Sequence, residues 1–220
     1  MGPIKIDQYA RFICIFSLII LSCSSEKKMK EETTTPEPAE PTEIQLLETG
    51  INKLKNWAEF WESKGADLNV KNFHPKQEHE YEVIEWPEEN VLSEENPLKT
   101  YQIPNPGSKG ILDIYSYKLV VDDKNQVDFN PDSEVVYYKN NGMRERLLFI
   151  GPSGIFEDAV WISDEQLMVS GHLQKEDGYV PIVWLVYPHL HQYTIFESIF
   201  STKDYSPDEY LREKLENLNF

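Results

Sequence analysis

The sequence predicts an α+β domain that is mainly β: an antiparallel meander sheet, open, curved or sandwiched, with an N-terminal amphipathic helix and a short C-terminal helix. Three observations predict this class. Apolar residues recur at helical spacing over residues 43–64, and short segments rich in β-branched and aromatic residues follow one another after Gly110. Turn residues separate these segments, and connections this short force neighbouring strands to run antiparallel.

The first expected element is a helix over residues 43–64. Its apolar side chains are three or four residues apart, which places them on one face; they are Ile44, Leu47, Ile51, Leu54, Ala58 and Trp61. Trp57 and Phe60 widen this face, and Gly65 is a natural stop for the helix. We expect the face to cover one side of the sheet.

Residues 66–110 carry weaker signals. Residues 81–86 alternate apolar and charged side chains, as a half-buried strand does, while prolines in the surrounding sequence indicate long loops. The polar segment 74–80 contains Pro75 and is interpreted as a solvated loop. It includes His74 and His79, but their spacing matches no zinc-protease motif.

The region after Gly110 is predicted to be β-rich. The expected strands cover residues 111–121, 126–129, 134–139, 144–150, 158–162, 166–173, 180–187 and 193–196. The strongest turn signal is Asn141-Gly142, which is typical of a tight hairpin. A terminal helix is then expected to begin at Ser206, with Ser206 as its N-cap, Pro207 at its first position and Glu209 completing a capping box.

Part of this region is similar to β-propeller blade sequence. Such a blade has a Trp-bearing strand, a short turn, a strand with a glycine and a second Trp-bearing strand, and Trp161, Gly171 and Trp184 occur in that order. The resemblance spans roughly residues 110–200, about two blades. Because a closed propeller needs about four blades or more, it implies an open, curved or sandwiched sheet here.

The N-terminal residues predict an export signal that ends in a lipid anchor. Lys5 and Arg11 are basic, residues 12–22 form a short apolar run, and Cys23 closes it. The motif Ile20-Leu21-Ser22-Cys23 resembles the lipobox of bacterial lipoproteins. The resemblance implies a signal peptide over residues 1–22 and lipidation, including palmitate, at Cys23. It also implies a membrane anchor in the cell envelope, at the outer membrane, with the periplasmic or surface face left open.

Residues 23–43 and 44–220 are expected to behave differently. The first segment holds Cys23 and then a charged, Thr/Pro-rich tether that has too few apolar side chains to fold. The second segment is long enough for one globular domain. Lipobox, tether and acidic composition together resemble small envelope lipoproteins of Bacteroidota.

The charge and cysteine content exclude several classes of function. The chain has 21 Lys and Arg against 38 Asp and Glu, a net charge of −17, which disfavours nucleic-acid binding because phosphate contacts need basic side chains. The two cysteines are Cys14 and Cys23, so residues 44–220 contain no disulfide and no catalytic thiol. No cofactor fingerprint is present, and we expect no cofactor.

Two sets of residues are candidates for holding a metal ion. His189 and His191 would lie on the same side of an extended segment, with His172, Asp158 or Glu157 as a possible third ligand. The run from residue 122 to residue 132, including Asp123 and Asp128, has oxygen ligands of the kind that calcium prefers. Polar turns explain both patterns more simply, so we predict no metal.

The sequence favours a non-enzymatic binding or assembly module with a protein partner in the envelope. Residues 151–154, Gly-Pro-Ser-Gly, lack the second glycine of a nucleophile elbow. Candidate contact edges are residues 137–138 and 184–187. The alternative is an envelope hydrolase that uses a carboxylate pair, Glu157 with Asp158 or Glu85 with Glu88, or a metal near His189 and His191.

Overall fold

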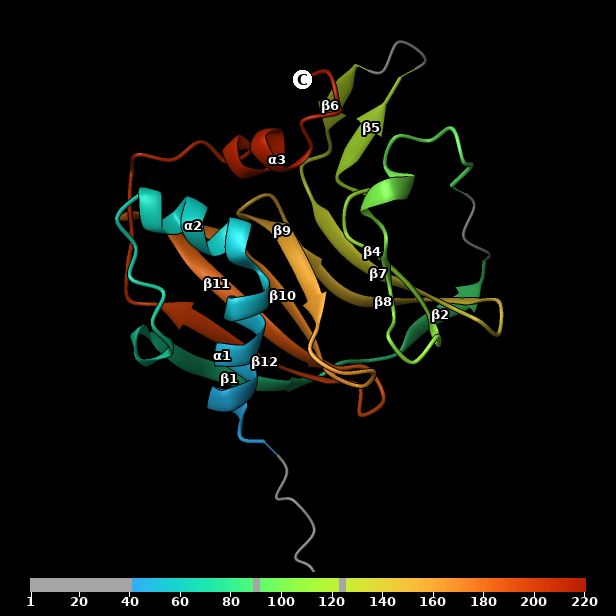
Figure 1. The fold of residues 1–220 in the computed structure, drawn as a ribbon, viewed down its shortest axis with the longest axis horizontal. Coiled ribbons are helices and arrows are strands. Elements are labelled where there is room, and N and C mark those ends of the chain that lie inside the picture. Colours follow the sequence, from blue (N-terminus) through green and yellow to red (C-terminus); the bar gives the residue numbers. More distant parts are fainter. Residues whose placement is uncertain (1–40, 89–91, 123–125) are drawn as a thin grey trace, which may run out of the picture. The chain divides into compact units, whose positions relative to one another are not determined.

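A computed structural model describes residues 41–88, 92–122 and 126–220 (Figure 1). The predicted signal peptide, Cys23 and most of the tether lie outside these residues. The fold class is confirmed: within these ranges, two antiparallel five-stranded sheets and a two-stranded hairpin are accompanied by three α-helices. In the described part of the chain, no helix has the length and apolar character needed to cross a lipid bilayer.

Two consecutive helices replace the single helix predicted over residues 43–64. They are α1 (Glu43–Lys53) and α2 (Lys55–Ser63), and Leu54 ends one and begins the other. The ψ angle of Leu54 is 52°, outside the helical range, so the chain bends there while Leu54 itself stays buried. The predicted apolar face is therefore divided between two helix axes. Thr42 and Gln45 form a capping box at the start of α1.

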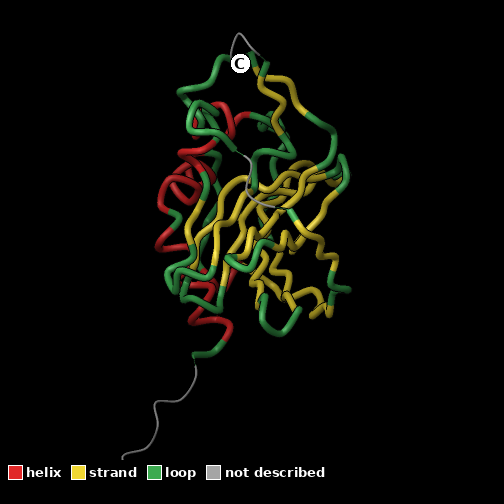
Figure 2. Tube along the Cα trace, turned by 90° about the vertical axis from the view of Figure 1, so that its right-hand side faces the viewer, coloured by secondary structure: helices red, strands yellow, loops and turns green. Residues whose placement is uncertain are grey.

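The first sheet carries the helices on one face (Figures 1 and 2). Its strand order is β1 (Phe73–Glu80), β12 (Gln192–Ser198), β11 (Gly178–Tyr187), β10 (Leu167–Lys175) and β9 (Gly154–Trp161). The last four strands form the predicted meander. Helix α1 contacts β9 and β11, and α2 contacts α3 (Glu209–Lys214). The buried side chains of the helices thus form the core with this face of the sheet.

The prediction of a solvated loop at residues 74–80 was wrong. This segment is β1, an edge strand paired with β12, and the register shifts between Pro75 and Gln77. An edge strand tolerates proline, because the missing N–H does not have to bond to a second neighbour. Most of its side chains are exposed, which explains why its composition resembles that of a loop.

The second sheet has the order β2 (Ile84–Pro87), β8 (Met143–Ile150), β7 (Ser133–Lys139), β4 (Gly110–Asp113) and β3 (Ile103–Pro104). Its strand β7 contacts β9, so the two sheets meet along these strands. The hairpin of β5 (Leu119–Val121) and β6 (Val127–Phe129) is separate. Short 3₁₀ helices cover Val70–Asn72 and Lys99–Tyr101.

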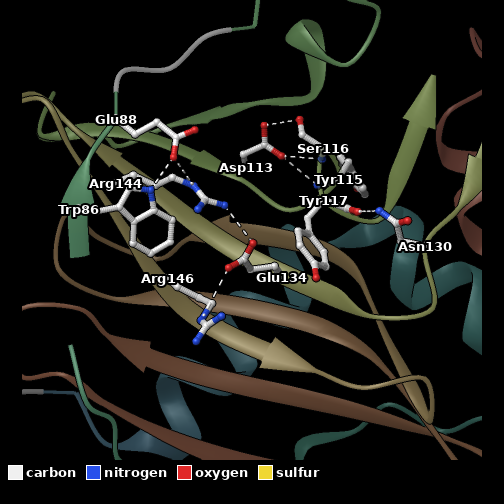
Figure 3. Close-up of polar contacts among 10 residues, drawn as sticks. All are labelled: Trp86, Glu88, Asp113, Tyr115, Ser116, Tyr117, Asn130, Glu134, Arg144 and Arg146. Carbon is white, nitrogen blue, oxygen red and sulfur yellow. Dashed lines mark hydrogen bonds and ion pairs between the residues drawn. The ribbon is translucent and has the colours of Figure 1, made fainter. Parts of the chain in front are cut away.

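The strand predicted over residues 111–121 is interrupted after Asp113. The Asp113 carboxylate accepts hydrogen bonds from the backbone N–H groups of Tyr115 (3.0 Å) and Ser116 (2.9 Å), as Figure 3 shows. An aspartate that bonds to the backbone two and three residues ahead stabilises a turn in place of an extended chain. The segment is consequently split into β4 and β5.

Helix α3 begins later than predicted. Its first residue is Glu209, and Asp208 stands at the N-cap without a side-chain cap bond. Half of the expected capping box is present, because the Ser206 N–H donates to Glu209 Oε2 at 3.2 Å. Residues 206–208 form a turn, and the helix follows it.

Glu157, buried within β9, is the polar centre of the core. It is the extra residue of a β-bulge opposite Ser170 and Gly171 on β10. Its carboxylate accepts hydrogen bonds from the indoles of Trp57 (2.7 Å) and Trp61 (3.1 Å). His172 Nδ1 lies 2.8 Å from the same carboxylate, and the Tyr205 hydroxyl also donates to it. These contacts link α2, β9, β10 and the segment before α3.

The neighbouring Asp158 links the sheet to α3. It accepts from the Tyr210 hydroxyl at 2.6 Å and forms an ion pair with Lys214 at 2.7 Å. The carboxylates of Glu157 and Asp158 therefore both have hydrogen-bond or ion-pair partners within the protein. This arrangement is suited to holding helices on a sheet.

We predict that the domain loses stability at alkaline pH, because Tyr205 and Tyr210 are buried. Burial, and then the charges of Glu157 and Asp158, raise the pKa values of Tyr205 and Tyr210 well above 10. Below pH 10 the folded and unfolded chains both keep these protons, and the stabilisation is complete. Above about pH 10 the unfolded chain releases them, so stability should fall by about 1.4 kcal/mol per pH unit for each such tyrosine.

The measurement is an absorbance titration at 295 nm, together with circular dichroism, on the full-length chain in detergent. We expect most phenolate absorbance to appear together with unfolding above pH 10. Gradual ionisation of nearly all tyrosines around pH 10 with the fold intact would contradict this prediction.

Candidate functional site

A cleft of about 440 Å³ opens where the two sheets meet. Its walls include Tyr137 on β7, Glu145 on β8 and Trp161 at the end of β9. Its rim is formed by the β7–β8, β9–β10 and β11–β12 turns. Figure 1 shows the last two of these turns close together at the lower edge of the domain. The volume is in the range of small-molecule sites.

Two buried polar atoms on residues that line this cleft have no hydrogen-bond partner among the described residues, and a third has an ion-pair partner only. The first two are the Tyr137 hydroxyl and the Trp161 indole nitrogen, and the third is Glu145 Oε2, which lies 2.6 Å from Lys139 Nζ. The three residues are 6%, 4% and 0% exposed. Folded proteins pair most buried polar atoms, because an unpaired one costs about 1–3 kcal/mol. The two unpaired atoms of Tyr137 and Trp161 make this cleft the candidate ligand site.

The aromatic pair is held in place from both sheets. The rings of Tyr137 and Trp161 have centroids 5.4 Å apart and are inclined at 58°. Lys53 of α1 donates to the backbone carbonyls of Trp161 and Ile162, each at 3.1 Å, which fixes the end of β9. Burial, and then the charge of Glu145, raise the pKa of Tyr137 to about 12. Its hydroxyl therefore remains protonated at neutral pH and can donate.

Glu145 has neighbours from three segments of the chain: the β1–β2 connection, β7 and the β11–β12 turn. The Tyr81 hydroxyl donates to Oε1 at 3.2 Å, and His191 Nε2 lies 3.9 Å from the same oxygen. Lys139 Nζ is 2.6 Å from Oε2 and 3.2 Å from Glu85. The Lys139–Oε2 contact is an ion pair, and a carboxylate oxygen with one such partner has a second lone pair that can accept a further hydrogen bond.

Lys109 also lines the cleft. It pairs with Asp164 at 2.7 Å and with Glu165 at 3.6 Å, and both partners belong to the β9–β10 turn. The hydrogen bond to Asp164 raises the pKa of Lys109 and lowers that of Asp164. Asn105 donates to the Asp164 backbone carbonyl at 2.9 Å and so fixes this turn. Both lysines of the cleft therefore have carboxylate partners.

His189 and His191, the candidate metal ligands, both line the cleft. His191 has a φ of 53°, a left-handed conformation that is uncommon for a residue with a side chain. Its ring contacts Tyr81 edge-on, with the centroids 5.8 Å apart. In the described part of the chain, no group of three or more His, Cys, Asp or Glu is arranged to hold a metal.

The other predicted ligands lie elsewhere. His172, Glu157 and Asp158 belong to the core network beside the helices. Asp128 is an exposed residue of β6, and Asp123 lies outside the described residues.

The predicted contact edges divide between cleft and core. Tyr137 lines the cleft, while Tyr138 is half-buried on the opposite face of β7. Trp184 is buried, and its ring packs against Phe156 with the centroids 4.9 Å apart. Tyr187 is half-buried. Residues 184–187 are therefore mainly part of the core, and Trp184 is not available to a partner in the folded domain.

A second cleft of about 340 Å³ is less suited to binding, because its central polar groups have partners within the protein. Lys118 donates to the backbone carbonyls of Asn130 (2.6 Å) and Pro131 (3.1 Å). His172 is bonded to Glu157. Burial lowers the pKa of Lys118.

The outer face of the second sheet carries a paired charge cluster (Figure 3). The Arg144 guanidinium stacks over the Trp86 ring at 4.4 Å, and one of its NH₂ groups lies 2.9 Å from Glu134. Glu88 accepts from the Trp86 indole at 2.6 Å. These contacts join β2, β7 and β8.

Comparison with known proteins identifies no relative. No family model matches the chain, and neither a curated protein nor a solved structure matches it.

Proposed function

We propose that this protein is a lipid-anchored, non-enzymatic binding module of the cell envelope and that the cleft beside Tyr137, Glu145 and Trp161 is its ligand site. The observation that carries the binding proposal is that Tyr137 and Trp161, which line one cleft beside the Glu145 carboxylate, each have a buried polar atom without a partner among the described residues. A ligand that supplies their missing partners offsets the desolvation penalty that the free protein carries. The ion-paired rim favours a preformed site over one that assembles on binding.

A screen of chemically diverse small molecules tests this proposal. Full-length protein in zwitterionic detergent is examined by ligand-observed NMR, alongside the Trp161→Phe and Tyr137→Phe variants. We expect compounds whose binding is weakened in both variants. If no compound binds, or if no binder is sensitive to either variant, the cleft is not a ligand site.

Tyr137→Phe should separate stability from binding. The substitution removes a buried hydroxyl that has no partner in the free protein, so we expect the unfolding free energy to stay the same or rise by up to about 1 kcal/mol. Ligand affinity should fall at the same time. Urea unfolding and titration with a compound from the screen measure the two effects.

Tyr138→Phe is the matched control for this variant, because Tyr138 is the next residue of β7 and points to the other face of the sheet. It should leave ligand affinity unchanged. A loss of more than about 1 kcal/mol in Tyr137→Phe would mean that the hydroxyl has a structural partner.

The lipid anchor rests on the lipobox-like motif that ends at Cys23. Metabolic labelling with an alkyne analogue of palmitate tests it directly. The wild-type chain and the Cys14→Ala control should take up the label, and Cys23→Ala should not. Labelling that persists in Cys23→Ala would overturn the proposed anchor.

A protein partner in the envelope is also part of the proposal. In-cell crosslinking of the wild type beside Cys23→Ala, followed by mass spectrometry, should identify a partner that is lost without the anchor. Recovery of the same proteins with both forms would argue against an anchor-dependent assembly.

One observation favours an envelope hydrolase as the second candidate: His191 lies 3.9 Å from the buried Glu145 carboxylate. Metal analysis of the purified protein distinguishes the two functions. Stoichiometric metal that is lost on His191→Ala would support the hydrolase, and ligand binding by metal-free protein would support the binding module.

A further inference from the structure

We infer that the cleft takes a neutral, polyhydroxylated ligand of the saccharide class. This inference rests on the proposed binding function and specifies its ligand. It follows from the hydrogen-bonding atoms of the lining, from the charge balance of the rim and from the mixture of polar and apolar side chains in the lining.

The buried polar atoms of Tyr137, Trp161 and Glu145 favour a ligand that both accepts and donates hydrogen bonds. The Trp161 indole N–H can only donate, so the ligand must bring an acceptor. The Glu145 carboxylate can only accept, and beside its ion pair with Lys139 it has lone pairs left for a donor of the ligand. The Tyr137 hydroxyl can do either. Hydroxyl groups meet all of these requirements, and a ring that carries several of them can reach separate atoms at once.

The charges of the cleft argue against an ionic ligand. Lys139 is held between Glu145 and Glu85, and Lys109 is held by Asp164 and Glu165. No lysine of the lining is therefore available to an anion without breaking an ion pair, and the chain carries a net charge of −17. An ammonium group has donors but no acceptor, so it would leave the Trp161 N–H unpaired.

The remaining neutral classes are hydroxyl-rich and amide-rich compounds. The aromatic pair Tyr137 and Trp161, with Pro188 at the rim, supplies apolar surface beside the polar atoms. A sugar ring presents C–H groups on its faces and hydroxyls around its edge, which matches this mixed lining. A planar amide directs one donor and one acceptor within a single plane, so it reaches fewer separate atoms of the lining than a ring that carries several hydroxyls. The volume of about 440 Å³ has room for a small saccharide.

Isothermal titration of the full-length protein in a zwitterionic detergent, free of glycoside detergents, tests the inference. The panel contains glucose, galactose, N-acetylglucosamine and their common disaccharides. Glucose 6-phosphate and glucosamine are the charged counterparts, and N-acetylglycinamide and a neutral dipeptide amide represent the amides. We expect at least one neutral saccharide to bind, and its anionic and cationic counterparts to bind at least about tenfold more weakly.

The variants connect that binding to the cleft. Trp161→Phe and Tyr137→Phe should each weaken saccharide binding by about tenfold, the effect of one lost hydrogen bond, while Tyr138→Phe should leave it unchanged. Tyr137→Phe keeps the test decisive if Trp161→Phe fails to fold.

Two different failures can be told apart. Amides or charged compounds that bind more tightly than every saccharide, with the same sensitivity to Trp161→Phe, would overturn the saccharide class and leave the proposed binding function in place. Binding of no class at the cleft, here and in the wider screen, would overturn both.

Discussion

Replacing Glu157 with alanine is expected to lower the unfolding free energy by about 3–5 kcal/mol, a large share of the stability of a domain of this size. The carboxylate is fully buried and accepts from Trp57, Trp61 and Tyr205. Its loss would leave these donors and His172 without partners in the core, and each unsatisfied donor adds a desolvation penalty. The contacts between the helices and the first sheet would weaken together.

Urea unfolding of the full-length chain, followed by tryptophan fluorescence, measures this effect. Glu157→Gln should be less severe, because the amide oxygen still accepts while its NH₂ group faces other donors. Glu48→Ala, on the exposed side of α1, is the matched control and should change stability by less than about 0.5 kcal/mol. A loss below about 1 kcal/mol for Glu157→Ala would mean that the network does not hold the fold together.

Gly171→Ala should also be strongly destabilising, by about 3 kcal/mol. Gly171 lies on β10 opposite the β-bulge that contains Glu157, and a Cβ at this position would overlap the backbone carbonyl oxygen of Ile155. The overlap involves the backbone of the neighbouring strand, so it cannot be relieved by a side-chain rotation. Moving β9 away would displace Glu157 from its donors.

Gly151→Ala is the control for that variant. A Cβ at Gly151 would meet nothing closer than 3.9 Å, so the change should stay within about 0.5 kcal/mol. Urea unfolding of both variants measures the difference. Equal stabilities for Gly171→Ala and Gly151→Ala would show that the bulge can move without affecting the core.

Much of the fold could be predicted from the sequence because its signals are local. The meander after Gly110 follows from alternating apolar segments and turn residues, and the observed strands β7 to β12 match the predicted ones to within a few residues. The errors arise where the conformation of a segment depends on contacts with residues that are distant in the sequence. Pro75 is compatible with a strand only because β1 is an edge, and the bend at Leu54 is invisible in an uninterrupted helical pattern.

The candidate site was predictable only in part. The sequence singled out His189 and His191 as candidate metal ligands, and both residues line the cleft. Glu145 and Trp161 were missed, because their significance comes from contacts between two sheets that are distant in sequence. One usable signal was present: Glu145 is an ionisable residue at an alternate position of a strand, where its side chain shares the inward face with Leu147 and Tyr137.

The most direct test of the cleft as a ligand site is the ¹H–¹⁵N spectrum of the tryptophan indoles of the full-length chain, recorded with and without a compound from the screen. The indoles of Trp57 and Trp61 are bonded to Glu157, and that of Trp86 is bonded to Glu88. The ligand should therefore shift the Trp161 indole signal downfield, as a new hydrogen bond forms, and leave those three in place. A bound ligand that leaves the Trp161 signal unchanged would contradict the proposed site.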